Sequence, residues 1–508
     1  MRIAAFCLSL IPVACIVFEV SPALCQVAGT GSIQGVISDP SGAALPGATV
    51  TATNDATGVK TSRDTTEAGY YVLSPLPPGQ YTVTVTAPGF QQLVQQHVTV
   101  DALAQVGLNL TVTVGAESQA VTVTAAPPPL NTTDASMGQT MRNEIYDALP
   151  LQMGNAPRDP TAFTAYMPGV STSSATGNTA GNVLGSQEHS QEIYIEGMPT
   201  TNPSAEGESR TLGLGISVEA VDQFQLESAG TSVMYQGQGA SNYVIKSGTN
   251  NFHGEAFEFL RNTAFDARGF FAPTTPTEHQ DEFGFSISGP IIKNKLFFFA
   301  NYDGFRFTQQ AQPAFASIPT LAERTGNFSA LLPSIVIYDP NSTACNASGT
   351  VCTRTAFQNN VIPMNRLSPI SQYFQSFLPN PINNNLQSNF LESVPIGYHD
   401  NSTTDKVDYT LNEKHSFQVF FSHGHRSQTT PYRGNTLPLP YANTRIVDEY
   451  PTLALVKWTF VPSANVVNEF TYGLARFSVP ITNATIAGNY PIKAGLAGLP
   501  PGEAASSF

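Results

Sequence analysis

Residues 246–262 read KSGTNNFHGEAFEFLRN, and residues 281–299 read DEFGFSISGPIIKNKLFFF. In the second segment Phe283, Phe285 and Ile287 alternate with glycine and serine. A sheet surrounded by water does not place phenylalanine outward and serine inward at this density. A strand of a membrane-embedded barrel does, because lipid contacts one face and a polar lumen contacts the other. The second segment therefore predicts a hairpin of a transmembrane β-barrel with aromatic side chains on its outer side.

The same alternation returns three more times, over residues 407–411, 417–421 and 470–474. Four such segments are hard to obtain by chance. Short turns separate the expected strands, whereas residues 308–402 have no strong period and are expected to form a long outer loop. The alternative is a large soluble β-sandwich, but the short and uneven spacing supplies too few packed partners for it.

The composition agrees with strands and turns. Only 12% of the 508 residues are charged, while glycine (40), proline (38) and phenylalanine (31) are abundant. Long helices favour alanine, leucine, glutamate and lysine instead. The net charge of −14 argues against a nucleic-acid partner, which requires a basic face.

The chain begins with Met1-Arg2, continues with an apolar run to Val20, and then reaches small residues before Cys25. This order is typical of a signal peptide, so residues 1–25 are expected to be removed on export. Cleavage after Cys25 fits best, and cleavage after Ala23 is the second choice. A membrane anchor is the alternative, although a proline and a glutamate interrupt the run.

Two cysteines remain after such cleavage, Cys345 and Cys352, within a loop rich in Ser, Thr and Asn. In an exported protein they are expected to form a disulfide that closes this loop.

Residues 30–116 contain turn residues every eight to twelve positions, as in a small β-sandwich. The patterns G-x-I-x-G-x-V, P-G-A-x-V, L-P-P-G-x-Y-x-V and P-G-F resemble the carboxypeptidase regulatory-like domain, a transthyretin-like sandwich. That resemblance implies no peptidase activity. It leaves two roles open: a periplasmic spacer or docking domain, and a glycan-contacting module.

Residues 117–129 are expected to form a linker that contains an apolar–polar alternation and ends in prolines. This segment resembles the TonB box of energised outer-membrane transporters. Such a role suits an extended segment, because a free strand can pair with the sheet of a partner protein. The alternative is that it forms the last strand of the preceding sandwich. The candidate TonB-box residues are Val121, Thr122, Val123, Thr124 and Ala125.

Residues 130–250 are expected to form a small mixed α/β segment. Its motifs, from L-P-L and P-G-V to V-E-x-V-x-x-F and Y-x-G-x-G-A, resemble the plug domain of TonB-dependent receptors. Loops at the outer end of such a plug bind ligand. The candidate ligand-contacting residues are therefore Glu188, His189 and Glu196.

Residues from about 30 to 480 together resemble the Oar-like branch of TonB-dependent receptors. The specific patterns are K-S-G-T-N-x-F-H-G, F-x-R-N and S-G-P-I-I-K-N-K-x-F-F-F. The resemblance implies a mainly β protein in the cell outer membrane, with residues 251–508 forming an incomplete barrel. Only about seven strands are expected before residue 480, whereas family members close with twenty-two, so a fragment of a longer chain is expected.

The function that the resemblance implies is ligand uptake. A periplasmic TonB-type energy transducer would be the partner, and the imported ligand would be a siderophore, cobalamin, saccharide or peptide. We expect no enzyme activity, and no catalytic, cofactor or metal site was found in the sequence. The alternative function is an outer-membrane-anchored adhesion or carbohydrate-binding surface protein.

Overall fold

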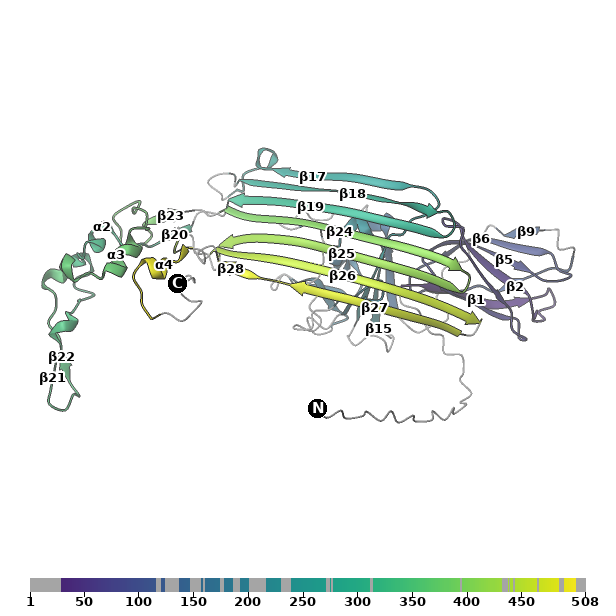
Figure 1. Ribbon diagram of the computed structural model, residues 1–508, viewed down its shortest axis with the longest axis horizontal. Helices are drawn as coiled ribbons and strands as arrows, with labels where there is room; N and C mark the ends of the chain where they lie inside the picture. The colour runs from purple at the N-terminus through teal and green to yellow at the C-terminus, as the bar shows by residue number, and fades with distance from the viewer. Residues whose placement is uncertain are drawn as a thin grey trace, which may run out of the picture.

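A computed structural model shows the protein as mainly β, which confirms the predicted fold class. It has four parts: a sandwich domain, an inner sheet, a large antiparallel sheet and a loop unit at the far end (Figure 1). The residues described are 29–115, 120–123, 137–146, 157–158, 160–173, 178–185, 192–200, 216–229, 239–270, 275, 277–310, 314–392, 395–431, 437, 439–441, 444–463, 466–483 and 488–498.

The sandwich domain consists of two sheets, with strand orders β4-β1-β7 (β8 also pairs with β1) and β3-β2-β5-β6-β9. Alternate residues of β2, β5 and β6 are buried, as expected for strands with one packed face. Its strands are β1 (Gly31–Ser38), β2 (Thr49–Asn54), β3 (Lys60–Asp64), β4 (Tyr70–Leu76), β5 (Gly79–Thr86), β6 (Gln92–Val100), β7 (Gln105–Gly107), β8 (Leu110–Thr111) and β9 (Ala120–Val123).

One core fills the space between the two sheets. It takes Ile33 and Leu73 from the first sheet and Val50, Val83 and Val98 from the second, all of them almost completely buried. Of the β9 residues whose side chains the structure describes, Val121–Val123, none belongs to this core. Gly35 is required where β1 approaches Leu108, because a Cβ at this position would overlap the Leu108 backbone.

The inner sheet has the strand order β10-β15-β16-β13-β14, in which β13 and β16 run parallel and the other pairs are antiparallel. A separate pair, β11-β12, and short helical turns accompany it. The elements are β10 (Met137–Arg142), α1 (Asn143–Tyr146), η1 (Pro160–Tyr166), β11 (Val170–Ser173), β12 (Asn178–Val183), β13 (Glu192–Ile195), β14 (Met198–Pro199), η3 (Val218–Ala220), β15 (Val221–Ala229) and β16 (Ala240–Ile245).

The large sheet is a meander of long antiparallel strands in the order β17-β18-β19-β24-β25-β26-β27, with β28 beside β26 (Figure 1). Its strands are β17 (His253–Asn262), β18 (Glu278–Ile292), β19 (Leu296–Gln310), β24 (Pro395–Asn412), β25 (His415–Pro431), β26 (Thr444–Ser463), β27 (Val466–Ser478) and β28 (Ile481–Asn483); the turn η4 (Thr263–Phe265) follows β17. Within the described part of the chain, none of the helices is long and apolar enough to cross a membrane.

The outer face of the large sheet carries the alternating apolar residues found in the sequence. Phe285, Val419, Phe470 and Tyr472 are 51%, 46%, 57% and 68% exposed. Residues that pair directly on neighbouring strands lie on the same face of a sheet. Phe285 pairs with Tyr302 and Val456 pairs with Tyr472, so the apolar side chains of successive strands share the outer face. Lipid is the environment that suits such a face.

Strand β19 differs from the prediction that aromatic residues occupy only the outer side of the hairpin. Phe297 and Phe299 are 3% exposed and point inward, while Phe298 lies on the outer face between them. A run of three phenylalanines must place rings on both faces, because successive side chains alternate. Phe257 and Phe259 of β17 also face inward, where they contact Arg158.

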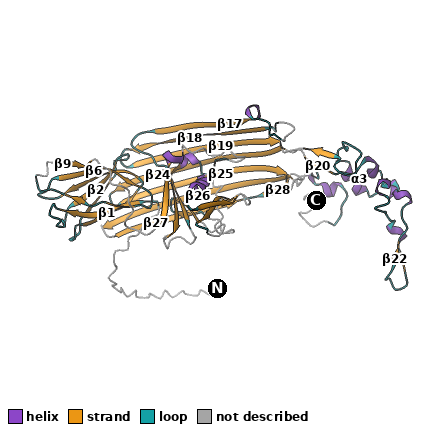
Figure 2. Cartoon of the chain, turned by 180° about the vertical axis from the view of Figure 1, so that it is seen from behind, coloured by secondary structure: helices purple, strands orange, loops and turns teal. Residues whose placement is uncertain are grey.

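The short turns of the large sheet lie at the end that carries the sandwich domain, and the loop unit projects from the opposite end (Figures 1 and 2). The β18–β19 turn has Asn294 at φ 60°, which suits a tight hairpin. The loop unit, residues 314–392, contains β20 (Ala314–Ala316), α2 (Leu321–Arg324), η5 (Ser329–Leu331), η6 (Pro340–Ser342), β21 (Ala344–Cys345), β22 (Cys352–Thr353), η7 (Gln358–Asn360), η8 (Met364–Arg366), α3 (Pro369–Gln375) and β23 (Phe390–Glu392); α4 (Tyr490–Lys493) lies near it.

Polar side chains hold the loop unit together. The amide of Asn360, 1% exposed, accepts from the Ile337 N–H and donates to the carbonyls of Phe328 and Ile335. Arg366 pairs with Asp339 at 2.6 Å and, through this hydrogen bond, holds the pKa of the Asp339 carboxyl below its usual value.

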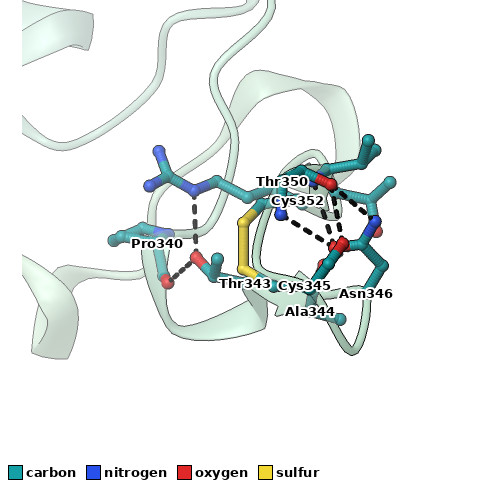
Figure 3. The surroundings of a disulfide bond; sticks show 11 residues. Pro340, Thr343, Ala344, Cys345, Asn346, Thr350 and Cys352 are labelled. Carbon is teal, nitrogen blue, oxygen red and sulfur yellow. Dashed lines mark hydrogen bonds between the residues drawn. A yellow bond between two sulfur atoms is a disulfide. The ribbon is translucent and has the colours of Figure 1, made fainter.

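A disulfide closes the tip of the loop unit (Figure 3). It joins Cys345 and Cys352, with 4.0 Å between their Cα atoms, across the two-stranded ladder β21–β22. Inside the closed ring, the Asn346 side-chain oxygen accepts from the Thr350 and Val351 N–H groups.

The sandwich core gives a direct stability prediction. Leu73→Ala removes a side chain that is fully buried, so it should cost about 2–5 kcal/mol of sandwich stability. Val36→Ala, at a position 38% exposed on the neighbouring strand β1, serves as the control and should cost far less. Hydrogen exchange of the β1 and β4 amides measures both effects. Equal exchange rates in the two variants would contradict the assignment of this core.

Candidate functional site at the interface of the inner and large sheets

The inner sheet packs against the inward face of the large sheet, and one apolar cluster spans the interface. Side chains from both sheets are buried together, which makes the contact resemble the interior of a domain. The inner sheet and its helical turns contribute Phe163, Val218, Val221 and Phe224, and the large sheet contributes Phe299, Phe420, Leu453 and Leu455.

Glu196 lies in the tight turn between β13 and β14, at the centre of this interface. Both turn residues, Glu196 and Gly197, have positive φ values of 52° and 81°. Two such residues in succession are typical of a two-residue hairpin turn. A left-handed glutamate is uncommon and costs about 1–3 kcal/mol, so neighbouring contacts must hold it in place.

Those contacts come from three strands of the large sheet and one of the inner sheet. The Glu196 carboxylate accepts from Lys406 Nζ at 2.8 Å, from the Ile245 N–H at 2.7 Å and from Gln418 Nε2 at 2.5 Å. The Glu196 carbonyl accepts from Lys457 Nζ at 3.1 Å. We call this group of five residues the Glu196 clamp.

The Glu196 clamp is almost completely withdrawn from water. Glu196, Lys406 and Lys457 are 3%, 5% and 5% exposed. Burial by itself raises the pKa of the Glu196 carboxyl, but the ammonium groups of Lys406 and Lys457 outweigh it and hold the pKa below its usual value. The carboxylate is therefore ionised at neutral pH, and its charge is balanced within the interface.

A second charged contact, the Arg158 clamp, holds the inner segment to strands β17 and β18. The Arg158 guanidinium pairs with Glu219 at 2.7 Å and with Glu282 of β18 at 3.0 Å. It also lies over the rings of Phe259 and Phe257, with distances of 4.2 and 5.1 Å to the ring centroids. Aromatic rings attract a cation over their faces. The guanidinium is therefore held both by the two carboxylates and by the two aromatic rings.

The sandwich domain contacts the inner sheet next to this interface. Arg142, the last residue of β10, forms two hydrogen bonds to the Asp101 carboxylate, at 2.7 and 2.8 Å. The Gln223 side-chain oxygen accepts from the Ala102 N–H at 2.9 Å.

Asn250, just before β17, joins the sandwich domain to the large sheet. Its N–H donates to the Ala56 carbonyl at 3.0 Å, and its side-chain amide donates to the Thr57 carbonyl and to Asn294. A cavity of about 420 Å³ lies between the three parts and is lined by residues that include Tyr81, Arg142 and Lys406.

The structure does not place the candidate ligand-contacting residue Glu196 where ligand could reach it. Glu196 was expected in a loop open to ligand, but it lies buried in the clamp and does not present its carboxylate to solvent. The tight turn places Glu196 against the large sheet, and the inward-facing Lys406 and Lys457 bind its carboxylate and its carbonyl there. Glu188 and His189 lie outside the described residues.

Three of the five candidate TonB-box residues, Val121, Thr122 and Val123, belong to β9, which pairs in parallel with β6. This is the position that the alternative interpretation gave them, the last strand of the sandwich. Thr124 and Ala125 lie outside the described residues.

Sequence reasoning missed Lys406, Lys457 and Arg158. A signal for the two lysines was present, because each occupies an inward position of a barrel strand: Lys457 lies between Val456 and Trp458, and Lys406 directly precedes the alternating segment that begins at Val407. A charged residue that faces a packed interior needs a partner of opposite charge. Its partner could not be identified without the fold, since 210 positions separate Lys406 from Glu196. In the described part of the chain, no group of three His, Cys, Asp or Glu side chains could hold a metal ion.

The Glu196 clamp predicts a strong effect of one substitution. Lys406→Met leaves the buried Glu196 carboxylate without its closest cation, so it should destabilise the local interface by about 3–5 kcal/mol. Hydrogen exchange of residues 192–199 in the detergent-solubilised protein should accelerate accordingly. Lys414→Met is the matched control, because Lys414 is exposed in the turn after the same strand. Similar exchange in the two variants would show that the clamp contributes nothing.

The depressed pKa of Glu196 predicts how the clamp responds to pH. A carboxyl whose pKa is lower in the folded than in the unfolded protein adds stability above its unfolded value, and this stability is lost as the pH falls. Exchange protection of residues 192–199, corrected for intrinsic rates, should therefore stay constant from pH 8 to about 5. It should fall only below the usual value of 4.5. Loss of protection between pH 7 and 5.5 would contradict this account.

Comparison with known proteins places the chain in a family. The model described as "Outer membrane beta barrel domain" matches residues 244–508, and the "Carboxypeptidase regulatory-like domain" matches residues 32–113. The TonB-dependent transporter Oar of Myxococcus xanthus is 24% identical over 248 residues, which cover 46% of this chain and 23% of that relative. The chain thus spans less than a quarter of the relative's length.

Two solved structures are also similar. The siderophore receptor PirA from Acinetobacter baumannii is 15% identical, with a TM-score of 0.34 over 67% of this chain and 44% of its own. The outer membrane transporter YddB from Escherichia coli is 10% identical, with a TM-score of 0.41 over 68% and 40%. These scores are too low to carry an argument, so the assignment rests on the family models.

The first family model covers more than half of the chain and the second covers the sandwich domain. The resemblance to TonB-dependent receptors stated from the sequence is thereby confirmed. The protein belongs to the outer membrane β-barrel family, as a relative of TonB-dependent receptors that carries an N-terminal carboxypeptidase regulatory-like domain.

Proposed function

We propose that this protein is an outer-membrane receptor that binds a ligand outside the cell and imports it into the periplasm, driven by a TonB-type energy transducer. In this proposal residues 1–25 direct export and are removed. The inner sheet is the plug, the large sheet is part of the barrel wall, and the sandwich domain lies in the periplasm. The similarity to the transporter Oar supports the proposal.

One structural observation carries the proposal furthest: the inner sheet is held inside the large sheet by non-covalent contacts that can separate. The apolar cluster, the Glu196 clamp and the Arg158 clamp join side chains across the interface. Among the described residues, the two sheets form separate hydrogen-bonded ladders and share none. A force applied to the inner sheet can therefore move it without unfolding the wall around it.

The arrangement at the two ends supports the proposed direction. The short turns and the sandwich domain lie at one end, and the loop unit with its disulfide lies at the other (Figure 1). Barrels of this class have short turns on the periplasmic side and long loops outside the cell. The ligand would then meet the loop unit first. Binding by loops is reversible recognition, so the proposal includes no catalytic step.

The 120–123 segment provides the test. Replacing both Val121 and Val123 with proline in the full-length protein removes two backbone donors and prevents strand pairing with a transducer. Uptake of the transported ligand should fall at least tenfold while binding to cells persists. The measurement follows cellular uptake from a panel of ferric siderophores, cobalamin, oligosaccharides and peptides.

The matched control replaces the same two valines with threonine, which keeps the β-forming character of the segment. This variant should import at the wild-type rate. Unchanged uptake in the proline variant would refute transducer-driven import. Retained attachment to surfaces or glycans, without uptake of any ligand by the wild-type protein, would instead identify a surface adhesion protein.

A further inference from the structure

The sandwich domain is attached both to the inner sheet and to the large sheet. On the inner sheet, Arg142 donates two hydrogen bonds to the Asp101 carboxylate, and Gln223 accepts one from the Ala102 N–H. The attachment to the large sheet passes through Asn250, in the segment between β16 and β17. The sandwich domain therefore spans the boundary between the two sheets at the end where the short turns lie (Figure 1).

Asn250 is the centre of the second attachment. Its N–H donates to the Ala56 carbonyl at 3.0 Å, and its side-chain amide donates to the Thr57 carbonyl at 2.8 Å and to Asn294 Oδ1 at 2.7 Å. The Asn294 N–H, in the turn between β18 and β19, donates back to Asn250 Oδ1 at 2.9 Å. Gly58 completes the contact, since a Cβ at this position would lie 2.3 Å from Asn294 Oδ1. We call these five residues the Asn250 joint.

The two attachments differ in strength. Hydrogen bonds between an arginine and a carboxylate are roughly twice as strong as those between neutral groups. The Asn250 joint consists of neutral groups. Among the described residues, Arg63 of β3 and Glu413 attract each other across the same boundary, but no ion pair joins the sandwich domain to the large sheet. When the inner sheet shifts, the attachment to the large sheet is therefore the first to separate.

The cavity of about 420 Å³ lies where the two sheets meet the sandwich domain. Its lining includes Gln80, Tyr81 and Thr99 of the sandwich domain, and Glu196 and Gln418 of the Glu196 clamp. The interface between the two sheets therefore opens, at this end, into a cavity that the sandwich domain helps to enclose.

We propose that the sandwich domain is an exit gate for the imported ligand: it stays on the inner sheet and parts from the large sheet at the Asn250 joint when the inner sheet shifts. The cavity then opens to the periplasm, whereas the closed joint blocks this route in the resting protein. The inference rests on the proposed function and deepens it, because it assigns the sandwich domain a part in controlling import. It also gives the motif K-S-G-T-N a role, since the last residue of this motif is Asn250.

A disulfide across the Asn250 joint tests the inference. A Cβ at position 58 would lie 3.2 Å from Asn294 Cγ, the atom that a cysteine sulfur replaces, so Gly58→Cys with Asn294→Cys brings two thiols within disulfide range. Cells that express the full-length double variant receive a ligand that the wild type imports. The oxidised variant should bind this ligand at the cell surface like the wild type but import it at least tenfold more slowly. A reductant should restore import.

Two controls accompany this lock. The reduced double variant carries the same substitutions, so it reports any strain at positions 58 and 294, which both have positive φ values. Thr51→Cys with Ser62→Cys forms a cross-link within the sandwich domain, at paired positions of β2 and β3 whose hydroxyl oxygens are 3.0 Å apart. This cross-link should leave import unchanged, because it does not join the sandwich domain to the large sheet.

A second pair of variants identifies the sheet on which the sandwich domain stays, with import normalised to surface binding. Asn250→Ala weakens the joint and should leave import at the wild-type rate or above it. Asp101→Asn removes the charge from the attachment to the inner sheet, so the sandwich domain follows that sheet less readily and import should fall severalfold. Equal import by the two variants, or the reverse order, contradicts the assignment of the moving side.

The cross-linking results decide the inference. A locked protein that imports at the wild-type rate overturns it, because the joint then does not need to open. Loss of surface binding in the locked protein also overturns it, since a gate at the exit acts after binding. If the Gly58→Cys/Asn294→Cys pair does not cross-link while the control pair does, the joint is not closed at rest and the inference is refuted. A wild-type protein that imports no ligand refutes the proposed function instead, so the two failures are distinguishable.

Discussion

Every part of this molecule depends on a sheet whose two faces meet different surroundings. The strands of the large sheet place apolar side chains outward at alternate positions, where lipid suits them. The intervening positions face inward and must satisfy a different requirement, because they pack against another part of the same chain. This division explains why Phe285 is half exposed while Phe299, fourteen residues further along the chain, is buried.

Charges inside this interface have a role that apolar contacts do not provide. Packed apolar side chains resist displacement but are non-directional, whereas the Glu196 carboxylate accepts hydrogen bonds from defined donors on three strands. Buried ion pairs often contribute little net stability, because desolvation offsets their attraction. Their directional contacts fix the position of the inner sheet against the wall. The Arg158 clamp does the same from the side of β17 and β18.

Much of the fold could be predicted from local patterns, and the interface could not. Alternation over residues 407–411 and 417–421 identified strands, because every second side chain of a strand points to the same face. For the run Phe297–Phe299 alternation could not predict the orientation of the rings, because apolar residues at successive positions do not reveal which face meets lipid. Glu196 was misjudged as an open loop residue because a tight turn looks the same in sequence whether exposed or buried. For residues 121–123 the sequence left two roles open, and pairing with β6 depends on a neighbour that no local pattern specifies.

Two attachments to the sandwich domain bracket the passage from β9 to β10. β9 pairs with Gln92–Gln95 of β6, and Arg142 at the end of β10 binds Asp101, which directly follows β6. Both anchor points therefore belong to one short stretch of the sandwich. A rigid shift of that stretch against the inner sheet would therefore reach both strands at once.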